Sequence, residues 1–123
     1  MDGKDTVTIY HNPGCGTSRK VLGLLRDRGL APRVVEYLRT PPDEATLRDL
    51  LRRMGLPPSG LLRRKGTLWK ELGLDAPGVT EEAILAAMLA HPVLMERPVV
   101  IGPGGVALCR PVERVDAALA PAG

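Results

Sequence analysis

The order strand, helix, strand at the start of the chain constrains its fold more than any other feature. Residues 6–10, TVTIY, are β-branched and aromatic, which is typical of a strand. Apolar residues spaced three and four apart predict a helix over about residues 18–28, and Gly29 follows as a stop signal. Residues 33–38, RVVEYL, predict a second strand. A helix between two strands forms a βαβ unit, so we expect the two strands to be parallel and the crossover right-handed.

The middle of the chain is expected to be helical. Residues 40–43, TPPD, offer a cap residue at Thr40, prolines in the first turn and an acid near the positive end of a helix. Thr80 is expected to cap a further helix that ends near His91. Short helical turns are expected at residues 59–63 and 68–72. Both long helices have a core-facing stripe, formed by Leu47, Leu50, Leu51 and Met54 in the first and by Ile84, Leu85, Met88 and Leu89 in the second.

Two short apolar runs return the chain to β-structure. RPVVIG and VALCRP are joined by the turn sequence GPGG at residues 102–105, which predicts an antiparallel hairpin. A last helix is expected through Val112, Val115 and Leu119. The fold class is therefore α/β, and a chain of 123 residues is one domain by size, spanning residues 1–123.

Charge and hydropathy exclude several classes of protein. The net charge is +3, and acidic residues are interspersed throughout, so the chain is no polycationic arm for nucleic acid. Its longest apolar stretches fall short of the roughly 18 residues that span a membrane. Residues 1–10 lack the charged and apolar regions of a signal peptide. Two cysteines without a secretion signal favour a reducing compartment, so we expect a cytoplasmic protein.

One of the two cysteines lies in HNPGCGTSRK, between the first strand and the first helix. The unpaired N–H groups and the dipole of a helix start favour the anionic form of a thiol at Cys15, and such cysteines have pKa values of roughly 3.5–7.5. Gly14 and Gly16 leave room for an anion to approach the backbone. Ser18 follows three residues later, so the motif is C-x-x-S and holds no second thiol.

The residues alone leave simpler interpretations open. Cys15 would then be an inert small residue, Ser18 an ordinary residue of the first helical turn, and His11 merely the end of a strand. Cys109 lies in an apolar run and is expected to be a buried small residue.

The segment YHNPGCGTSRK resembles the signature of the glutaredoxin-dependent arsenate reductases, the ArsC family with a thioredoxin-like fold. YLRTPPDEATLRDLLRRMGL, LLRRK, ELGL, HPVLMERPVV and LCRP are similar to further blocks of that family, in the same order, over about residues 6–119. The resemblance implies a mixed four-stranded sheet with a helical insertion between the second and third strands, over about residues 40–92.

The resemblance also implies which residues form the site. Cys15 matches the catalytic cysteine, and His11 and Ser18 match residues that tune its thiol. Three arginines match oxyanion-binding positions: Arg63, Arg97 and Arg110. The loop residues Gly14, Gly16 and Thr17 complete the implied substrate-binding set, and Pro98 matches the cis-proline of thioredoxin-like folds.

The implied activity is reduction of arsenate to arsenite, with glutathione and glutaredoxin as thiol donors and partners and with no tightly bound cofactor or metal. Guanidinium groups suit the substrate because they neutralise an oxyanion and bind its oxygens bidentately. Two alternatives stay open. One is an Spx-like regulator of transcription that binds RNA polymerase, although redox-sensing members typically carry C-x-x-C. The other is a related glutathione-dependent thiol reductase with another substrate.

Overall fold

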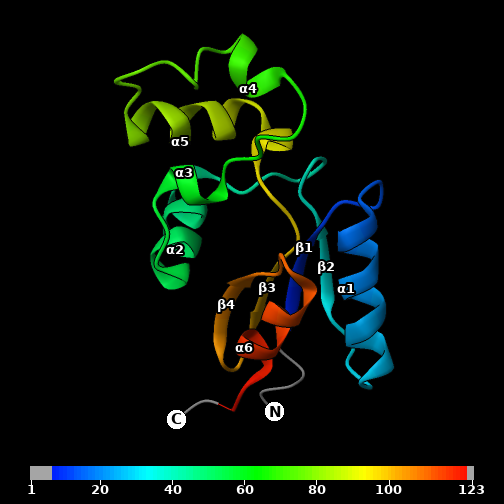
Figure 1. The fold of residues 1–123 in the computed structure, drawn as a ribbon. Helices are drawn as coiled ribbons and strands as arrows, with labels where there is room; N and C mark the ends of the chain where they lie inside the picture. Colours follow the sequence, from blue (N-terminus) through cyan, green and yellow to red (C-terminus); the bar gives the residue numbers. More distant parts are fainter. Residues whose placement is uncertain (1–6, 122–123) are drawn as a thin grey trace. The chain divides into compact units, whose positions relative to one another are not determined.

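Four short strands form one mixed sheet in the order β2-β1-β3-β4 (Figure 1). A computed structural model describes residues 7–121 of the chain. Strand β1 (Thr8–His11) pairs in parallel with β2 (Arg33–Glu36) and antiparallel with β3 (Val99–Gly102). Strand β4 (Gly105–Leu108) completes the hairpin with β3. The predicted βαβ unit, the hairpin and the thioredoxin-like mixed sheet are thereby confirmed.

The chain divides into two compact units. The first comprises the residues up to Thr40 together with those from Arg97 onward, and the second is Pro41–Glu96. The sheet belongs entirely to the first unit, and the second unit is the helical segment between β2 and β3. The expectation that residues 1–123 form a single domain stays a prediction.

The sheet of the first unit shares one core with two helical segments. Helix α1 (Gly16–Asp27) connects β1 to β2, and a short 3₁₀ turn, η3 (Val112–Arg114), leads into α6 (Val115–Leu119) after β4. The strands are short and apolar on the face that these segments cover, as the period of two requires. The buried cluster consists of Val7, Ile9, Val21, Leu22, Leu25, Val100, Cys109, Val115 and Ala118.

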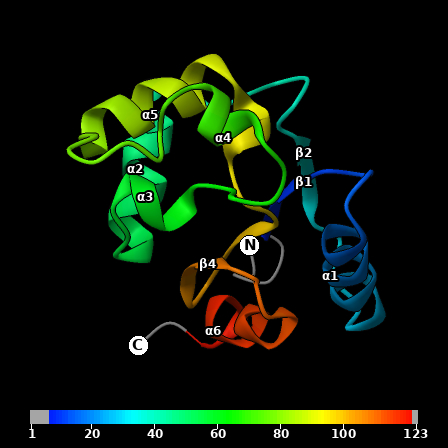
Figure 2. The ribbon, with the colours of Figure 1, turned by 45° about the horizontal axis from the view of Figure 1, so that its top comes forward.

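Two glycines of the hairpin allow α6 to lie directly against it, and both views show α6 beside β4 (Figures 1 and 2). The backbone N–H of Gly104 donates to the carbonyl of Ala118 over 2.9 Å. A Cβ atom at Gly104 would lie 2.3 Å from the carbonyl oxygen of Ala117, and one at Gly102 would lie 2.3 Å from that of Ala118. Only glycine permits so close a backbone approach.

The second unit is built from helices. These are α2 (Glu44–Met54), α3 (Pro58–Leu61), α4 (Leu68–Glu71), α5 (Glu81–Ala90) and the 3₁₀ turn η2 (Pro92–Leu94). Most of the predicted apolar stripes is buried, namely Leu47, Leu50, Leu51, Ile84, Leu85 and Met88, whereas Met54 and Leu89 are half-buried. Within residues 7–121, no helix has the length and apolarity that crossing a membrane requires.

The cap of α5 is confirmed and the cap of α2 is corrected. Thr80 Oγ1 accepts the N–H of Ala83 over 3.1 Å, as expected of the residue before α5. Helix α2 begins later than predicted, because Asp43 rather than Thr40 is its N-cap and accepts the N–H of Thr46 over 2.8 Å. Thr40 instead directs its hydroxyl to the carbonyl of Glu36.

Candidate active site

Cys15 is the N-cap residue of α1, where β1 gives way to the helix. Its N–H donates to the carbonyl of Asn12 over 3.0 Å, and its own carbonyl accepts the N–H of Arg19 over 3.0 Å. The helix begins at Gly16, about two residues earlier than predicted, so the thiol lies at the helix start itself. Cys15 is partly exposed and stands beside the exposed loop residues Gly14 and Gly16.

His11 and Ser18 form a buried pair beneath this loop. His11 Nδ1 and Ser18 Oγ are 2.6 Å apart, and the N–H of Asn12 donates to the same hydroxyl over 3.1 Å. Burial lowers the pKa of His11, the charges of Arg26 and Arg19 lower it further, and Glu36 opposes them. The imidazole is therefore mainly neutral near pH 7. The ring therefore faces Ser18 as a mainly neutral hydrogen-bond partner.

Two of the three predicted arginines lie at the ends of the β3–β4 hairpin in the first unit. Arg110 Nη1 is 3.9 Å from Cys15 Sγ and donates to the carbonyl of Arg97 over 3.1 Å. Arg97 precedes β3 and is buried, with 6% of its surface exposed. The Arg97–Pro98 peptide bond is cis, as the resemblance implied, and the Arg110–Pro111 bond is cis as well, which sequence analysis did not anticipate.

These surroundings favour the thiolate form of Cys15. Burial raises the pKa of the Cys15 thiol, but hydrogen bonds from the backbone of Ser18, the guanidinium of Arg97 and the backbone of Thr17 together outweigh it. The charge of Arg97 adds to this effect, and the net pKa is lower than the ordinary value. A thiolate with nearby donors and cations is a competent nucleophile toward an oxyanion.

The second thiol has the opposite character. Cys109 is completely buried in the core of the first unit, and its Sγ lies 3.6 Å from the carbonyl oxygen of Ala107. Burial, with a contribution from the charge of Asp116, raises the pKa of Cys109 to about 12. It is thus a small core residue, as predicted, and remains protonated at neutral pH.

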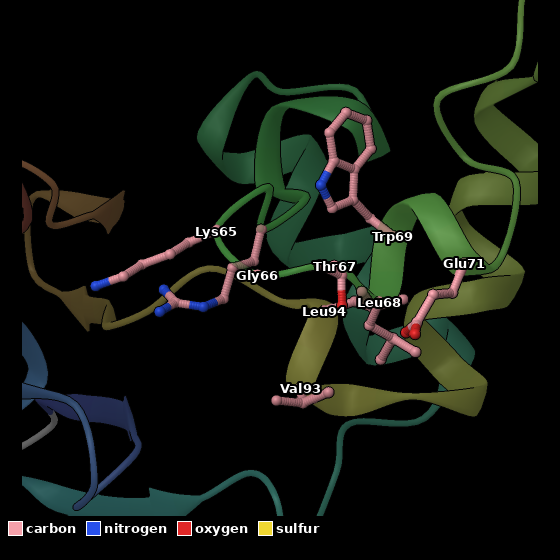
Figure 3. A pocket seen from close by; sticks show the side chains of 9 residues that line it. Lys65, Gly66, Thr67, Leu68, Trp69, Glu71, Val93 and Leu94 are labelled. Atoms are coloured by element: carbon pink, nitrogen blue, oxygen red, sulfur yellow. The ribbon is translucent and has the colours of Figure 1, made fainter.

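Arg63, the third predicted arginine, belongs to the second unit. The backbone N–H of Arg63 donates to the carbonyl of Leu94 over 2.7 Å, and its guanidinium Nη1 forms an ion pair with Glu96 over 2.9 Å. It also lines an open pocket of about 240 Å³ (Figure 3), together with Lys65, Gly66, Thr67, Leu68, Trp69, Glu71, Val93 and Leu94. No three His, Cys, Asp or Glu side chains among residues 7–121 gather where they would hold a metal ion.

Asn12 is the residue of the loop that sequence analysis missed. Its Oδ1 accepts the N–H of Gly14 over 2.8 Å, and its side chain is buried. The N–H of Gly14 is therefore occupied, and a Cβ atom at Gly14 would lie 3.3 Å from Asn12 Oδ1. The Asn-Pro pair at residues 12–13 was the available signal, because asparagine before proline commonly starts a turn.

Comparison with known proteins identifies the family. The ArsC family profile matches residues 10–118. An arsenate reductase of Rhizobium meliloti is 51% identical over 110 residues, covering 89% of this chain and 79% of that protein. An arsenate reductase of Neisseria meningitidis is 46% identical over 114 residues, covering 92% and 97%. The structure of an arsenate reductase from Vibrio cholerae, 42% identical, aligns over 93% of this chain and 98% of that chain with a TM-score of 0.87. Because profile, relatives and fold agree over most of its length, the chain belongs to the ArsC family.

Proposed function

We propose that the chain is an arsenate reductase whose nucleophile is the thiolate of Cys15. The observation that carries the proposal is Arg110 Nη1 at 3.9 Å from Cys15 Sγ, beside a thiol whose pKa is lowered. A thiolate attacking an anion meets like-charge repulsion, and fixed guanidinium groups offset it. The choice of arsenate as the substrate is based on the relatives named arsenate reductases, which are 46–51% identical to this chain.

In the first step, Cys15 Sγ attacks arsenic, and an arsenate hydroxyl group takes up a proton from solvent and leaves as water, which gives a sulfur–arsenic(V) ester. Arg110 and Arg97 hold the remaining oxygens and offset the charge that builds on them in the transition state. The backbone N–H groups of Thr17 and Ser18, which favour the thiolate in the resting protein, orient the sulfur for this attack. No proton has to be removed from Cys15 when it is already ionised.

In the second step, an external thiol reduces arsenic. The thiolate of glutathione attacks Cys15 Sγ and the sulfur–arsenic bond breaks. Its electron pair remains on arsenic, which leaves as arsenite, and a mixed disulfide between Cys15 and glutathione remains. Glutaredoxin then reduces that disulfide by thiol–disulfide exchange. An external donor is required because Ser18 stands where a C-x-x-C motif has its second thiol, and because Cys109 is buried and protonated.

The remaining site residues have supporting roles in this proposal. His11 holds Ser18, and Ser18 holds the helix start against Cys15. Gly16 leaves space for the oxyanion, and the backbone N–H of Thr17 donates to the sulfur of Cys15. The role of Arg63 in oxyanion binding rests on the family resemblance alone and stays a prediction. Reduced glutathione and glutaredoxin occur in reducing compartments, so we also propose that the protein is cytoplasmic.

The test is arsenite production by the purified protein with arsenate, glutathione and glutaredoxin, each omitted in turn. Turnover is expected only with all of them present. Cys15→Ser should abolish it, and the control Cys109→Ala should keep most of it. Equal loss in both variants would refute the external-donor mechanism. Retention of RNA polymerase on the immobilised protein, with no arsenate turnover, would favour the Spx-like alternative, and reduction of glutathione adducts alone would favour another substrate.

A further inference from the structure

Asn12 ties together the loop between β1 and α1 through both its side chain and its backbone. Its Oδ1 accepts the N–H of Gly14 over 2.8 Å, and its carbonyl accepts the N–H of Cys15 over 3.0 Å. Its own N–H donates to Ser18 Oγ over 3.1 Å. Asn12 is 8% exposed, its bond to Ser18 Oγ is buried, and its bond to the N–H of the exposed Gly14 is partly buried. One residue thereby links the end of the strand, the nucleophile and the first turn of the helix.

The pattern of these bonds determines which N–H groups remain for the sulfur. Asn12 occupies the N–H groups of Gly14 and Cys15, which precede the sulfur in the loop. The groups of Thr17 and Ser18 stay directed to the thiol. The bond to Ser18 Oγ also fixes the turn whose N–H the thiol uses. Three hydrogen bonds of Asn12 thus connect the loop that carries Cys15 to the start of the helix.

We propose that Asn12 is a positioning residue that holds Cys15 at the N-terminus of α1 by binding the N–H of Gly14 with its side chain. The inference rests on the proposed role of Cys15 as the nucleophile. Asparagine suits the position because it supplies a neutral acceptor within reach of a backbone two residues ahead. Aspartate would keep the acceptor but bring a negative charge to a loop that must hold a thiolate and an oxyanion.

The test compares Asn12→Ala, which removes the acceptor, with Asn12→Ser, which keeps a shorter neutral one. Asp43→Ala is the matched control, because Asp43 makes the same kind of side-chain bond to a backbone N–H, over 2.8 Å, at α2 of the second unit. Two quantities are measured: amide hydrogen exchange at Gly14 by NMR, and the pH profile of Cys15 alkylation by iodoacetamide. Neither requires arsenate, so both remain informative if the proposed reductase activity is absent.

In Asn12→Ala, the Gly14 amide is expected to exchange faster and the alkylation midpoint to move up by about one unit, which slows alkylation about tenfold at pH values below both midpoints. Asn12→Ser should restore most of both properties, and Asp43→Ala should change neither. A loss of thermal stability in Asn12→Ala with an unchanged alkylation midpoint would overturn the proposal, because the residue would then be merely structural. Asn12→Ser behaving like Asn12→Ala in a folded protein would also overturn it.

Discussion

Replacement of Arg97 should weaken the ionisation of Cys15, by an amount that follows from the contacts of the sulfur. The guanidinium of Arg97 lowers the pKa of Cys15 chiefly through a hydrogen bond and less through its charge. A charge-assisted hydrogen bond contributes about 1.5–3 kcal/mol, and one pKa unit corresponds to about 1.4 kcal/mol. Because Cys15 is partly exposed, solvent screening brings the expected effect to the lower end of that range. We expect Arg97→Gln to raise the pKa of Cys15 by about one unit.

The assay is the rate of Cys15 alkylation by iodoacetamide from mildly acidic to mildly alkaline pH, followed by intact mass. Cys109 does not compete, because it is buried and burial raises its pKa to about 12. Below both midpoints, Arg97→Gln should react about tenfold more slowly than the native protein, and well above them the two rates should converge. Thermal unfolding checks that the variant is folded, and Arg33→Gln, an exposed change on β2, is the control.

Arg97→Lys separates the two contributions of the arginine. Lysine keeps the positive charge but lacks the planar fork, so it should restore only a minor part of the lost ionisation. Complete restoration by lysine would mean that charge alone matters and that the hydrogen-bond argument is wrong. An alkylation profile of Arg97→Gln that coincides with the native one would refute the assignment of Arg97 to the thiol altogether.

Three further predictions concern the first unit. Cys109 should resist iodoacetamide in the folded protein and react only after denaturation; an adduct on Cys109 in the native state would contradict its burial. Gly104→Ala should cost about 1–3 kcal/mol of unfolding free energy in urea, because its Cβ would meet the Ala117 carbonyl, whereas Gly23→Ala, with nothing nearby, should cost none. Because the pKa of His11 is lowered from 6.5, the unfolded chain binds the proton more readily just below that value. The free energy of unfolding should therefore decrease as the pH is lowered from 6.5, and it should level off below the pKa of His11 in the folded protein. In urea titrations, His11→Gln should reduce this loss of stability. An unchanged dependence of stability on pH in the variant would contradict the prediction.

Local patterns were sufficient to predict the sheet. The β-branched runs, the turn sequence at residues 102–105 and the apolar stripes of the long helices each have one dominant structural meaning, and the parallel pairing of β1 with β2 follows from the helix between them. The start of α2 was mispredicted because Thr40 and Asp43 are both good cap residues. Only the observed bond between Asp43 and the N–H of Thr46 decides between them.

The candidate site was less predictable because its parts are far apart in the sequence. The glycines on either side of Cys15 and the helix that follows were sufficient to indicate a reactive thiol. Nothing in the local sequence of Arg110 indicates that its guanidinium lies 3.9 Å from a sulfur 95 positions earlier, and only the family resemblance selected it. The bonds of Asn12 were not predicted, because the Asn-Pro pair indicates a turn but does not show that Asn12 binds the N–H groups of Gly14 and Cys15.

The number of residues in β4 determines where the next two side chains, Cys109 and Arg110, are placed. Cys109 and Arg110 directly follow β4, and Cys109 is buried in the core while Arg110 Nη1 lies 3.9 Å from the thiol of Cys15. A single residue inserted within β4 would reverse the faces of the side chains on one side of the insertion and would displace Cys109 and Arg110 from these places. Engineered versions of the hairpin should therefore change length in the turn, or by two residues at a time in the strand.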